Sequence, residues 1–186
     1  DALDKFNVKC TFFAVEFWVE KYPEYCKKII KRGHEIGTHS KTHPKMSRLK
    51  KAQIEEEITS SKQAIEKVTD TAVTLFRPPF GDYDDLLIDT VSSLGLYSIQ
   101  WDVDSLDWKD LSADKIAARV VKGAKSGSII LCHNNGLHTA ESLPLIFSPL
   151  LSQGYEFVKI SDLIYKENYE ILPDGRQKSS NSATNR

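Results

Sequence analysis

The segment His34-Glu35-Ile36-Gly37-Thr38-His39-Ser40-Lys41-Thr42-His43-Pro44 predicts a short strand followed by a polar turn. Residues 34–38 form an apolar, β-rich run, which is typical of a strand. Two histidines, His39 and His43, follow directly and are four residues apart. Pro44 ends the turn, because proline has no N–H to give to a helix interior.

The same pattern of short strands and longer helices extends in both directions along the chain. Amphipathic runs predict helices at residues 21–32, 47–68, 84–94, 113–125 and 142–152. Apolar runs predict strands at residues 9–15, 34–38, 73–77, 97–101, 128–132 and 155–159. Residues 1–6 resemble the last turns of a further helix, whose strand would precede them. We therefore expect an α/β fold, built as a parallel sheet or as a (β/α) barrel without its first strand.

The size and charge of the chain narrow its functional class. Its 186 residues fit one domain, and 40% of them are hydrophobic. The formal net charge of −1 argues against a nucleic-acid partner, because there is no excess of Lys and Arg to pair with phosphates. Neither a signal peptide nor a membrane span is visible in the sequence. We expect the domain to cover residues 1–166 and residues 167–186 to form a loose C-terminal tail.

The two histidines suggest a metal site. On a helical turn, a spacing of four residues brings both imidazoles to one side, which suits Zn²⁺ or another transition metal. The signal is weak on its own, because such pairs also arise by chance. A zinc-protease HExxH motif starting at His34 is excluded, because Thr38 occupies the position of its second histidine.

Three more polar motifs follow predicted strands. They are Arg77-Pro78-Pro79-Phe80-Gly81, Asp104-Ser105-Leu106-Asp107-Trp108 and Leu131-Cys132-His133-Asn134. Each has an ordinary structural explanation alone: a rigid turn, the entry to a helix, and the polar end of a strand. In a barrel, however, successive strand ends meet at one rim, where barrel enzymes carry their active sites. Together the motifs predict one shared site.

HSKTH, RPPFG, DSLDW and LCH resemble, in order, motifs two to five of the polysaccharide deacetylases, the NodB-homology family. The resemblance extends from about residue 6 to residue 164, and KCTFFAV at residues 9–15 is similar to the second strand of the family. It implies an incomplete, distorted (β/α) barrel, seven-stranded in the family and here without its first strand. It also implies a polysaccharide substrate, such as peptidoglycan or chitin, from which acetyl groups are removed with a divalent metal, most readily Zn²⁺ or else Co²⁺.

The resemblance also implies roles for individual residues. His39 and His43 would be metal ligands, and His133 would be the general acid that protonates the leaving amine. Asp104, by motif position, would favour the protonated form of His133. Arg77 would orient the general base and keep it ionised. The backbone N–H of Phe80 would stabilise the oxyanion, and Trp108 and Leu131 would line the substrate groove and the acetate pocket.

Some positions depart from the family pattern. Phe80 replaces the usual Tyr, and Asn134 replaces a common Asp. The chain has no TFDDG segment, which in the family supplies the general base and a third metal ligand. We expect this loss to impair the chemistry, since removing a general base typically costs about 10²- to 10⁴-fold in rate.

Three functions fit these motifs. The first is a glycan deacetylase of the bacterial cell envelope or extracellular space, a location that the resemblance implies. The second is a non-catalytic glycan-binding or scaffolding remnant of such a domain. The third is a metal-dependent amide hydrolase that acts on a small molecule.

Overall fold

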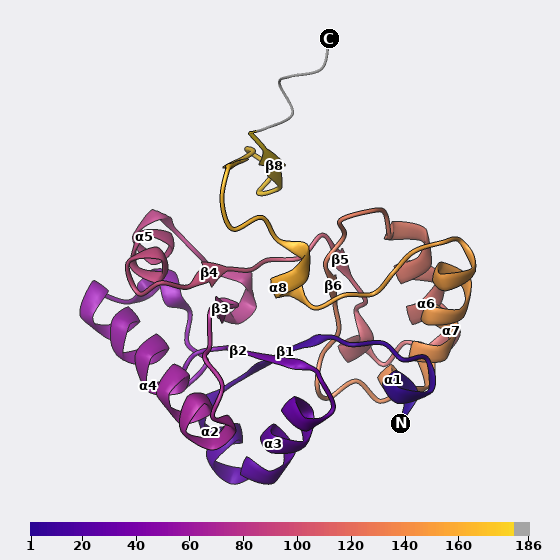
Figure 1. Cartoon of the computed structure of the whole chain (residues 1–186), viewed down its shortest axis with the longest axis horizontal. Coiled ribbons are helices and arrows are strands. Elements are labelled where there is room, and N and C mark those ends of the chain that lie inside the picture. Colours follow the sequence, from indigo (N-terminus) through magenta and orange to yellow (C-terminus); the bar gives the residue numbers. More distant parts are fainter. Residues whose placement is uncertain (181–186) are drawn as a thin grey trace.

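Four strands form one parallel sheet in the computed structural model, which describes residues 1–180 (Figure 1). In spatial order they are β1 (Thr11–Ala14), β2 (Glu35–Thr38), β3 (Leu75–Phe76) and β4 (Tyr97–Ser98). This is also their order in the chain, with a helical crossover between each pair of neighbours. Such a progression is how the wall of a (β/α) barrel is wound.

A second, smaller parallel sheet pairs β5 (Val103–Asp104) with β6 (Ile130–Leu131). The predicted α/β architecture with parallel strands is therefore confirmed. Within residues 1–180 the two sheets do not join into a closed barrel.

Helices surround both sheets. They are α1 (Ala2–Lys5), α2 (Glu16–Lys21), α3 (Pro23–Lys31), α4 (Lys51–Thr69), α5 (Asp85–Ser93), α6 (Ala113–Gly123), α7 (Thr139–Ser152) and α8 (Ile160–Leu163), with 3-10 turns η1 (Met46–Arg48), η2 (Pro79–Gly81) and η3 (Asp107–Lys109). Figure 1 shows α2 to α5 around the first sheet and α6 and α7 beside the second. The helix predicted at residues 21–32 begins earlier and is divided at Tyr22, because the residue before Pro23 disfavours helical geometry.

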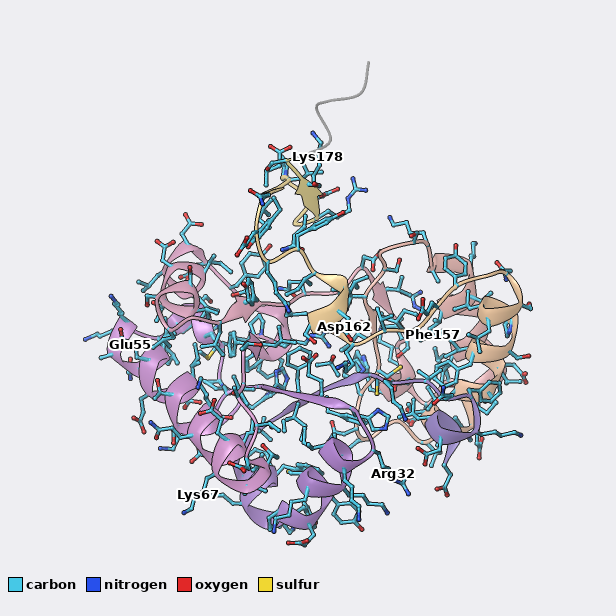
Figure 2. The ribbon with its side chains drawn as sticks, in the orientation of Figure 1. Arg32, Glu55, Lys67, Phe157, Asp162 and Lys178 are labelled. Atoms are coloured by element: carbon cyan, nitrogen blue, oxygen red, sulfur yellow. The ribbon has the colours of Figure 1, made fainter. Side chains whose placement is uncertain are left out.

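Side chains pack into separate hydrophobic clusters behind the sheets. In the first, Ile54, Ile58 and Ile65 of α4 are fully buried against the sheet and α2, α3 and α5. The opposite face of α4 carries charged residues, and Figure 2 shows Glu55 and Lys67 pointing away from the body. A second cluster joins α6 and α7 to β5. Because each sheet has its own apolar support, the loops at the strand ends are held on rigid elements.

Residues 155–159 differ from the prediction, since they form no strand. The apolar residues of this run are still used, because Phe157 packs against Phe147 with ring centroids 4.9 Å apart (Figure 2). The chain is then fastened to β1 by a side chain: the N–H of Ile160 donates to Thr11 Oγ1 at 2.9 Å. An apolar pattern marks burial, whereas a strand also requires a neighbouring backbone to pair with.

The C-terminal segment contains a hairpin where a loose tail was expected. Strands β7 (Tyr169–Ile171) and β8 (Gln177–Ser179) pair in antiparallel fashion and project from the body, with Lys178 at the far side (Figures 1 and 2). The rest of the expected tail, residues 181–186, lies outside the described residues. Among residues 1–180, no helix has the length and apolar character needed to cross a membrane.

Candidate active site

The carboxyl ends of the parallel strands bring the predicted site residues to one edge of the fold. His39 directly follows β2 and Arg77 directly follows β3. The backbone continues the sheet pairing into these positions, since the N–H of His39 donates to Ala14 and that of Arg77 donates to Thr38. His133 follows β6 by two residues.

His39 and His43 lie side by side, with ring centroids 4.9 Å apart. The Nδ1–H of His39 donates to the carbonyl oxygen of Arg77 at 2.6 Å. A carbonyl only accepts hydrogen bonds, so the neutral ring of His39 must carry its proton on Nδ1. This leaves the lone pair on Nε2, the atom available to a metal ion.

Burial favours the neutral form of both histidines. It lowers the pKa of His39 to about 4, against the opposing effect of the hydrogen bond to Arg77, and the charges of His43, Arg77 and His133 lower it further. Burial also lowers the pKa of His43. Two neutral imidazoles fit part of the donor set that Zn²⁺ takes in proteins. In residues 1–180, no cluster of three or more His, Cys, Asp or Glu side chains could hold a metal ion.

Helix α4 shapes the turn that carries the two histidines. The buried hydroxyl of Thr38 donates to Ser61 of α4 at 2.8 Å. The hydroxyl of Ser40 accepts from the N–H of His43 at 2.9 Å. The carboxylate of Glu57 accepts the backbone N–H groups of Lys41 and Thr42 at 2.9 and 2.8 Å. The turn is thus held both by side chains of α4 and by a hydrogen bond between its own residues.

Arg77 is a buried cation, only 7% exposed. Its guanidinium carbon lies 4.3 Å from the centre of the Phe13 ring and 5.7 Å from that of Trp101. One amino group donates to the carbonyl of Gln100 at 3.2 Å, while the buried Nε has no hydrogen-bond partner among the described residues. Burial lowers the pKa of Arg77 to about 10, so the group is still charged at neutral pH. A buried, incompletely paired cation is suited to hold an anion.

Phe80 lies at a tight turn beside the histidine pair. Its ring is 63% exposed and meets the ring of His43 edge-on, with centroids 4.6 Å apart. The backbone at Phe80 is left-handed, with φ of 60°. Gly81 follows with φ of +66°, and a Cβ there would come within 2.8 Å of the Trp101 ring. Gln100 fixes the turn by donating to the carbonyl of Gly81 at 2.9 Å.

Asp107 supplies the carboxylate that contacts His133. The expected partner, Asp104, makes a different hydrogen bond. Asp107 Oδ1 lies 2.8 Å from Nδ1 of His133, and Asp107 Oδ2 accepts the backbone N–H of His133 at 2.9 Å. The side chain of Asp104 instead accepts the N–H of Leu106 at 2.9 Å. This bond closes a left-handed turn at Leu106, which turns the following Asp107 inward.

Asp107 is held as a buried anion. Its side chain is fully buried. Burial acts to raise the pKa of Asp107, but hydrogen bonds from Thr139, His133 and Ser105 outweigh it and keep this pKa below its ordinary value. A fixed carboxylate of this kind orients the imidazole that it contacts.

The two predicted groove residues differ in exposure. Trp108 is 52% exposed, and its ring centroid lies 6.3 Å from that of His133. Leu131, at the end of β6, is only 8% exposed. Trp108 is therefore placed to contact a ligand above His133, whereas Leu131 lies below the surface.

Several residues in the loops of the site have strained backbone. Non-glycine residues with φ between +52° and +72° include Ser40, His43, Phe80, Leu106 and Asp110. Such conformations are unfavourable for bulky residues and persist where the surrounding structure imposes them, which is frequent at functional sites.

Several residues that shape the site carry no signal of this in the sequence. Glu57 resembles any charged residue of an amphipathic helix, and Gln100 lies inside the run predicted as a strand at residues 97–101. Thr139, whose hydroxyl donates to Asp107 at 2.7 Å, is distant from it in sequence. Asp107 itself is part of the DSLDW motif, and only the turn geometry distinguishes it from Asp104.

Known proteins are similar to this chain in sequence and in structure. The family model described as polysaccharide deacetylase matches residues 1–99. The peptidoglycan-N-acetylglucosamine deacetylase PgdA of Listeria monocytogenes is 36% identical over 171 residues, which cover 92% of this chain and 36% of that protein. This chain thus spans about a third of the length of that relative.

Solved structures agree with the family model. The Bc1960 peptidoglycan N-acetylglucosamine deacetylase superposes with a TM-score of 0.86 at 30% identity, over 88% of this chain and 78% of that one. A CE4 family pseudoenzyme from Bacillus anthracis superposes with a TM-score of 0.84 at 33% identity, over 87% of this chain and 57% of that one. The chain belongs to the polysaccharide deacetylase family.

Proposed function

We propose that the chain removes acetyl groups from an N-acetylated polysaccharide, with water, to give a free amine and acetate. One observation carries the proposal. A pair of neutral imidazoles, His39 and His43, lies at the same edge of the fold as a third imidazole, His133, which is fixed by a buried carboxylate. Metal-assisted amide hydrolysis needs side chains that bind the metal and another that donates a proton. Here His39 and His43 would do the first, and His133 would do the second.

His39 and His43 would hold a divalent metal, with Zn²⁺ or Co²⁺ as candidates. The bond from His39 Nδ1 to Arg77 supports this role, because it orients the ring and leaves Nε2 free. A bound metal of this type lowers the pKa of water and polarises the acetyl carbonyl.

His133 would protonate the leaving amine. Its Nδ1–H is engaged by Asp107, so Nε2–H is the group that can donate to substrate. In hydrolysis the C–N bond breaks as the nitrogen takes this proton, and the acetyl carbon keeps the oxygen delivered by water. Asp107 would keep the ring of His133 oriented for the transfer.

The remaining site residues would bind and orient the substrate. The cationic Arg77 would hold an anionic group of the substrate or of a bound ligand in place. The backbone N–H of Phe80 would face the oxyanion, Trp108 would contact the sugar, and Leu131 would support the acetate pocket.

Peptidoglycan is the polysaccharide substrate that we propose first, because of the names of two relatives. The Listeria relative is named as a peptidoglycan-N-acetylglucosamine deacetylase, and so is the Bc1960 structure. A chitin-like glycan would present the same acetamide. Action on peptidoglycan would place the chain at the cell envelope or outside the cell.

A second candidate is a glycan-binding domain without catalysis. Two features favour it: Arg77 has a buried Nε without a partner, and among residues 1–180 no third metal-ligating side chain joins His39 and His43. The similarity to a CE4 family pseudoenzyme also points this way. In this case the groove beside Trp108 would bind glycan without turning it over.

Acetate release separates the two candidates. The chain would be incubated with N-acetylated peptidoglycan and with a chitin oligomer, with added Zn²⁺ and after removal of metal by a chelator. Metal-dependent acetate release that is lost in His133→Ala supports the deacetylase. Retention on insoluble peptidoglycan without acetate release from either substrate would overturn it in favour of the binding domain.

A further inference from the structure

Thr139 begins helix α7 and reaches the carboxylate that supports His133. Its hydroxyl lies 2.7 Å from Asp107 Oδ2 and also 3.2 Å from the carbonyl of Gly136. A hydroxyl has one proton, and only one of these two acceptors is charged. The shorter bond is therefore the charge-assisted one to Asp107.

The hydrogen bonds of Asp107 are divided between its two oxygens. Oδ1 faces Nδ1 of His133 at 2.8 Å, while Oδ2 takes the backbone N–H of His133 at 2.9 Å and the hydroxyl of Thr139. The carboxylate lies in a fully buried place, where an unmet acceptor is costly. Thr139 thus donates to Oδ2 beside the backbone N–H of His133, and this limits how far the carboxylate can rotate.

The space around this contact is closed. A Cβ at Gly136 would lie 2.0 Å from Thr139 Oγ1 and 3.0 Å from Asp107 Oδ2. The Thr139 hydroxyl therefore has little freedom to turn away, and no other group fits between it and the carboxylate.

We propose that Thr139 is a positioning residue that locks the Asp107 carboxylate, so that Oδ1 holds the Nδ1–H of His133 and directs Nε2 toward the site. The proposal rests on the proposed function only in that His133 is taken to act on substrate. Without the hydroxyl, Oδ2 loses its side-chain donor, the carboxylate rotates to recover a partner, and the bond from Oδ1 to the ring lengthens.

Nuclear magnetic resonance of the imidazole tests this without any turnover. The probes are the Nδ1–H proton signal of His133 and the ring ¹⁵N chemical shifts, which distinguish the two neutral tautomers. The signals are assigned to His133 by their absence in His133→Gln. We expect wild type and Thr139→Ser to show a protected Nδ1–H signal. We expect Thr139→Val and Thr139→Ala to lose it and to show mixed tautomers.

The matched control is Thr90→Val. Thr90 is a buried helical threonine of α5, and its hydroxyl donates to the carbonyl of Leu86. This variant should keep the His133 signal. Thr139→Ala removes the hydroxyl without adding a branch, so it keeps the test open if Thr139→Val does not fold.

Turnover gives a second reading. We expect Thr139→Val to lower kcat by about 10- to 100-fold with KM nearly unchanged, as for other residues that orient a functional imidazole. Thr139→Ser should restore most of the rate. A protected Nδ1–H signal in both Thr139→Val and Thr139→Ala would overturn the proposal. A wild-type chain with the protected signal but no acetate release would instead count against the proposed function.

Discussion

Glu57 binds Thr42 with both of its carboxylate oxygens: Oε2 accepts the backbone N–H at 2.8 Å, and Oε1 accepts the hydroxyl at 2.6 Å. Thr42 lies in the turn between the two candidate metal ligands, His39 and His43. The helix that supplies Glu57 therefore fixes the distance between the two imidazoles. A metal site depends on such supporting bonds, because ligands that must be ordered on binding cost affinity.

We expect Glu57→Ala to weaken Zn²⁺ binding by about 10- to 100-fold while leaving the fold intact. The control is Glu55→Ala on the same helix, which loses only a surface pair with Lys51. Isothermal titration with Zn²⁺ would measure both affinities. Equal affinities in the two variants would mean that the turn holds its shape without Glu57.

His39 and His43 are expected to be jointly required for metal retention. His39→Ala or His43→Ala leaves a single imidazole, which does not hold Zn²⁺ against dilution. His133→Ala should keep the metal, because that ring is engaged with Asp107 and is proposed to donate a proton. Metal content after dialysis would be measured by atomic emission. Unchanged zinc in either of the first two variants would refute the assignment.

Asp107 and Asp104 provide a direct test of which carboxylate supports His133. Asp107→Asn places an amide among donors from His133 and Thr139, so we expect a loss of about 100-fold or more in kcat. Asp104→Asn keeps an oxygen that can accept the N–H of Leu106, and we expect a change below about threefold. Rates of acetate release would be compared at saturating substrate. The reverse order of effects would restore Asp104 as the partner.

The sequence predicted the loops of this site better than their internal geometry. His39, Arg77 and His133 follow from local features, because each comes directly after an apolar run and the carboxyl ends of parallel strands meet at one edge. The choice between Asp104 and Asp107 depends on a left-handed turn at Leu106, which no local propensity favours.

Long-range contacts account for the other differences. Thr139 and Glu57 lie on helices that are separated in sequence from the site residues they contact. The residues next to them in sequence do not indicate these contacts. Residues 155–159 have the apolar pattern of a strand, but pairing depends on a partner backbone at the right distance. A pattern of apolar residues thus predicts which side chains are buried better than it predicts which strands pair.

His34 is expected to make stability depend on pH. It is 7% exposed, and its Nδ1 accepts the backbone N–H of Cys10 at 3.3 Å, which requires an unprotonated nitrogen. Burial, with help from the charge of Lys9, lowers its pKa in the folded state below the ordinary value. A depressed folded pKa means that the unfolded chain takes up the proton first as pH falls. The stabilising contribution is thus present above about pH 6.5, the unfolded value, and is lost below it as the pH falls through the folded pKa.

Urea unfolding at a series of pH values, with metal excluded, would measure this effect. His34→Gln should reduce the loss of unfolding free energy between pH 7 and pH 5, while His39 and His43, whose pKa values burial also lowers, would still contribute to the remaining slope. His138→Gln is the control, because His138 lies at the surface beside Glu141. The same slope in His34→Gln as in wild type would mean that His34 does not titrate differently on folding.

Gly136 is expected to tolerate no side chain. A Cβ there would lie 2.0 Å from the Thr139 hydroxyl and 3.1 Å from Asp107 Cβ, and the latter is part of a fully buried residue that cannot move aside. Gly136→Ala should therefore displace Thr139, lower the free energy of unfolding by about 1–3 kcal/mol as overpacking does, and disturb His133 in the same way as loss of the hydroxyl.

Gly127→Ala is a poor control, because its φ of +83° adds backbone strain of its own. Ala140→Ser, on the exposed side of the first turn of α7, is a better one. Thermal unfolding combined with the His133 signal would decide: a stable Gly136→Ala variant with an unchanged Nδ1–H resonance would show that the pocket around Thr139 is looser than its contacts imply.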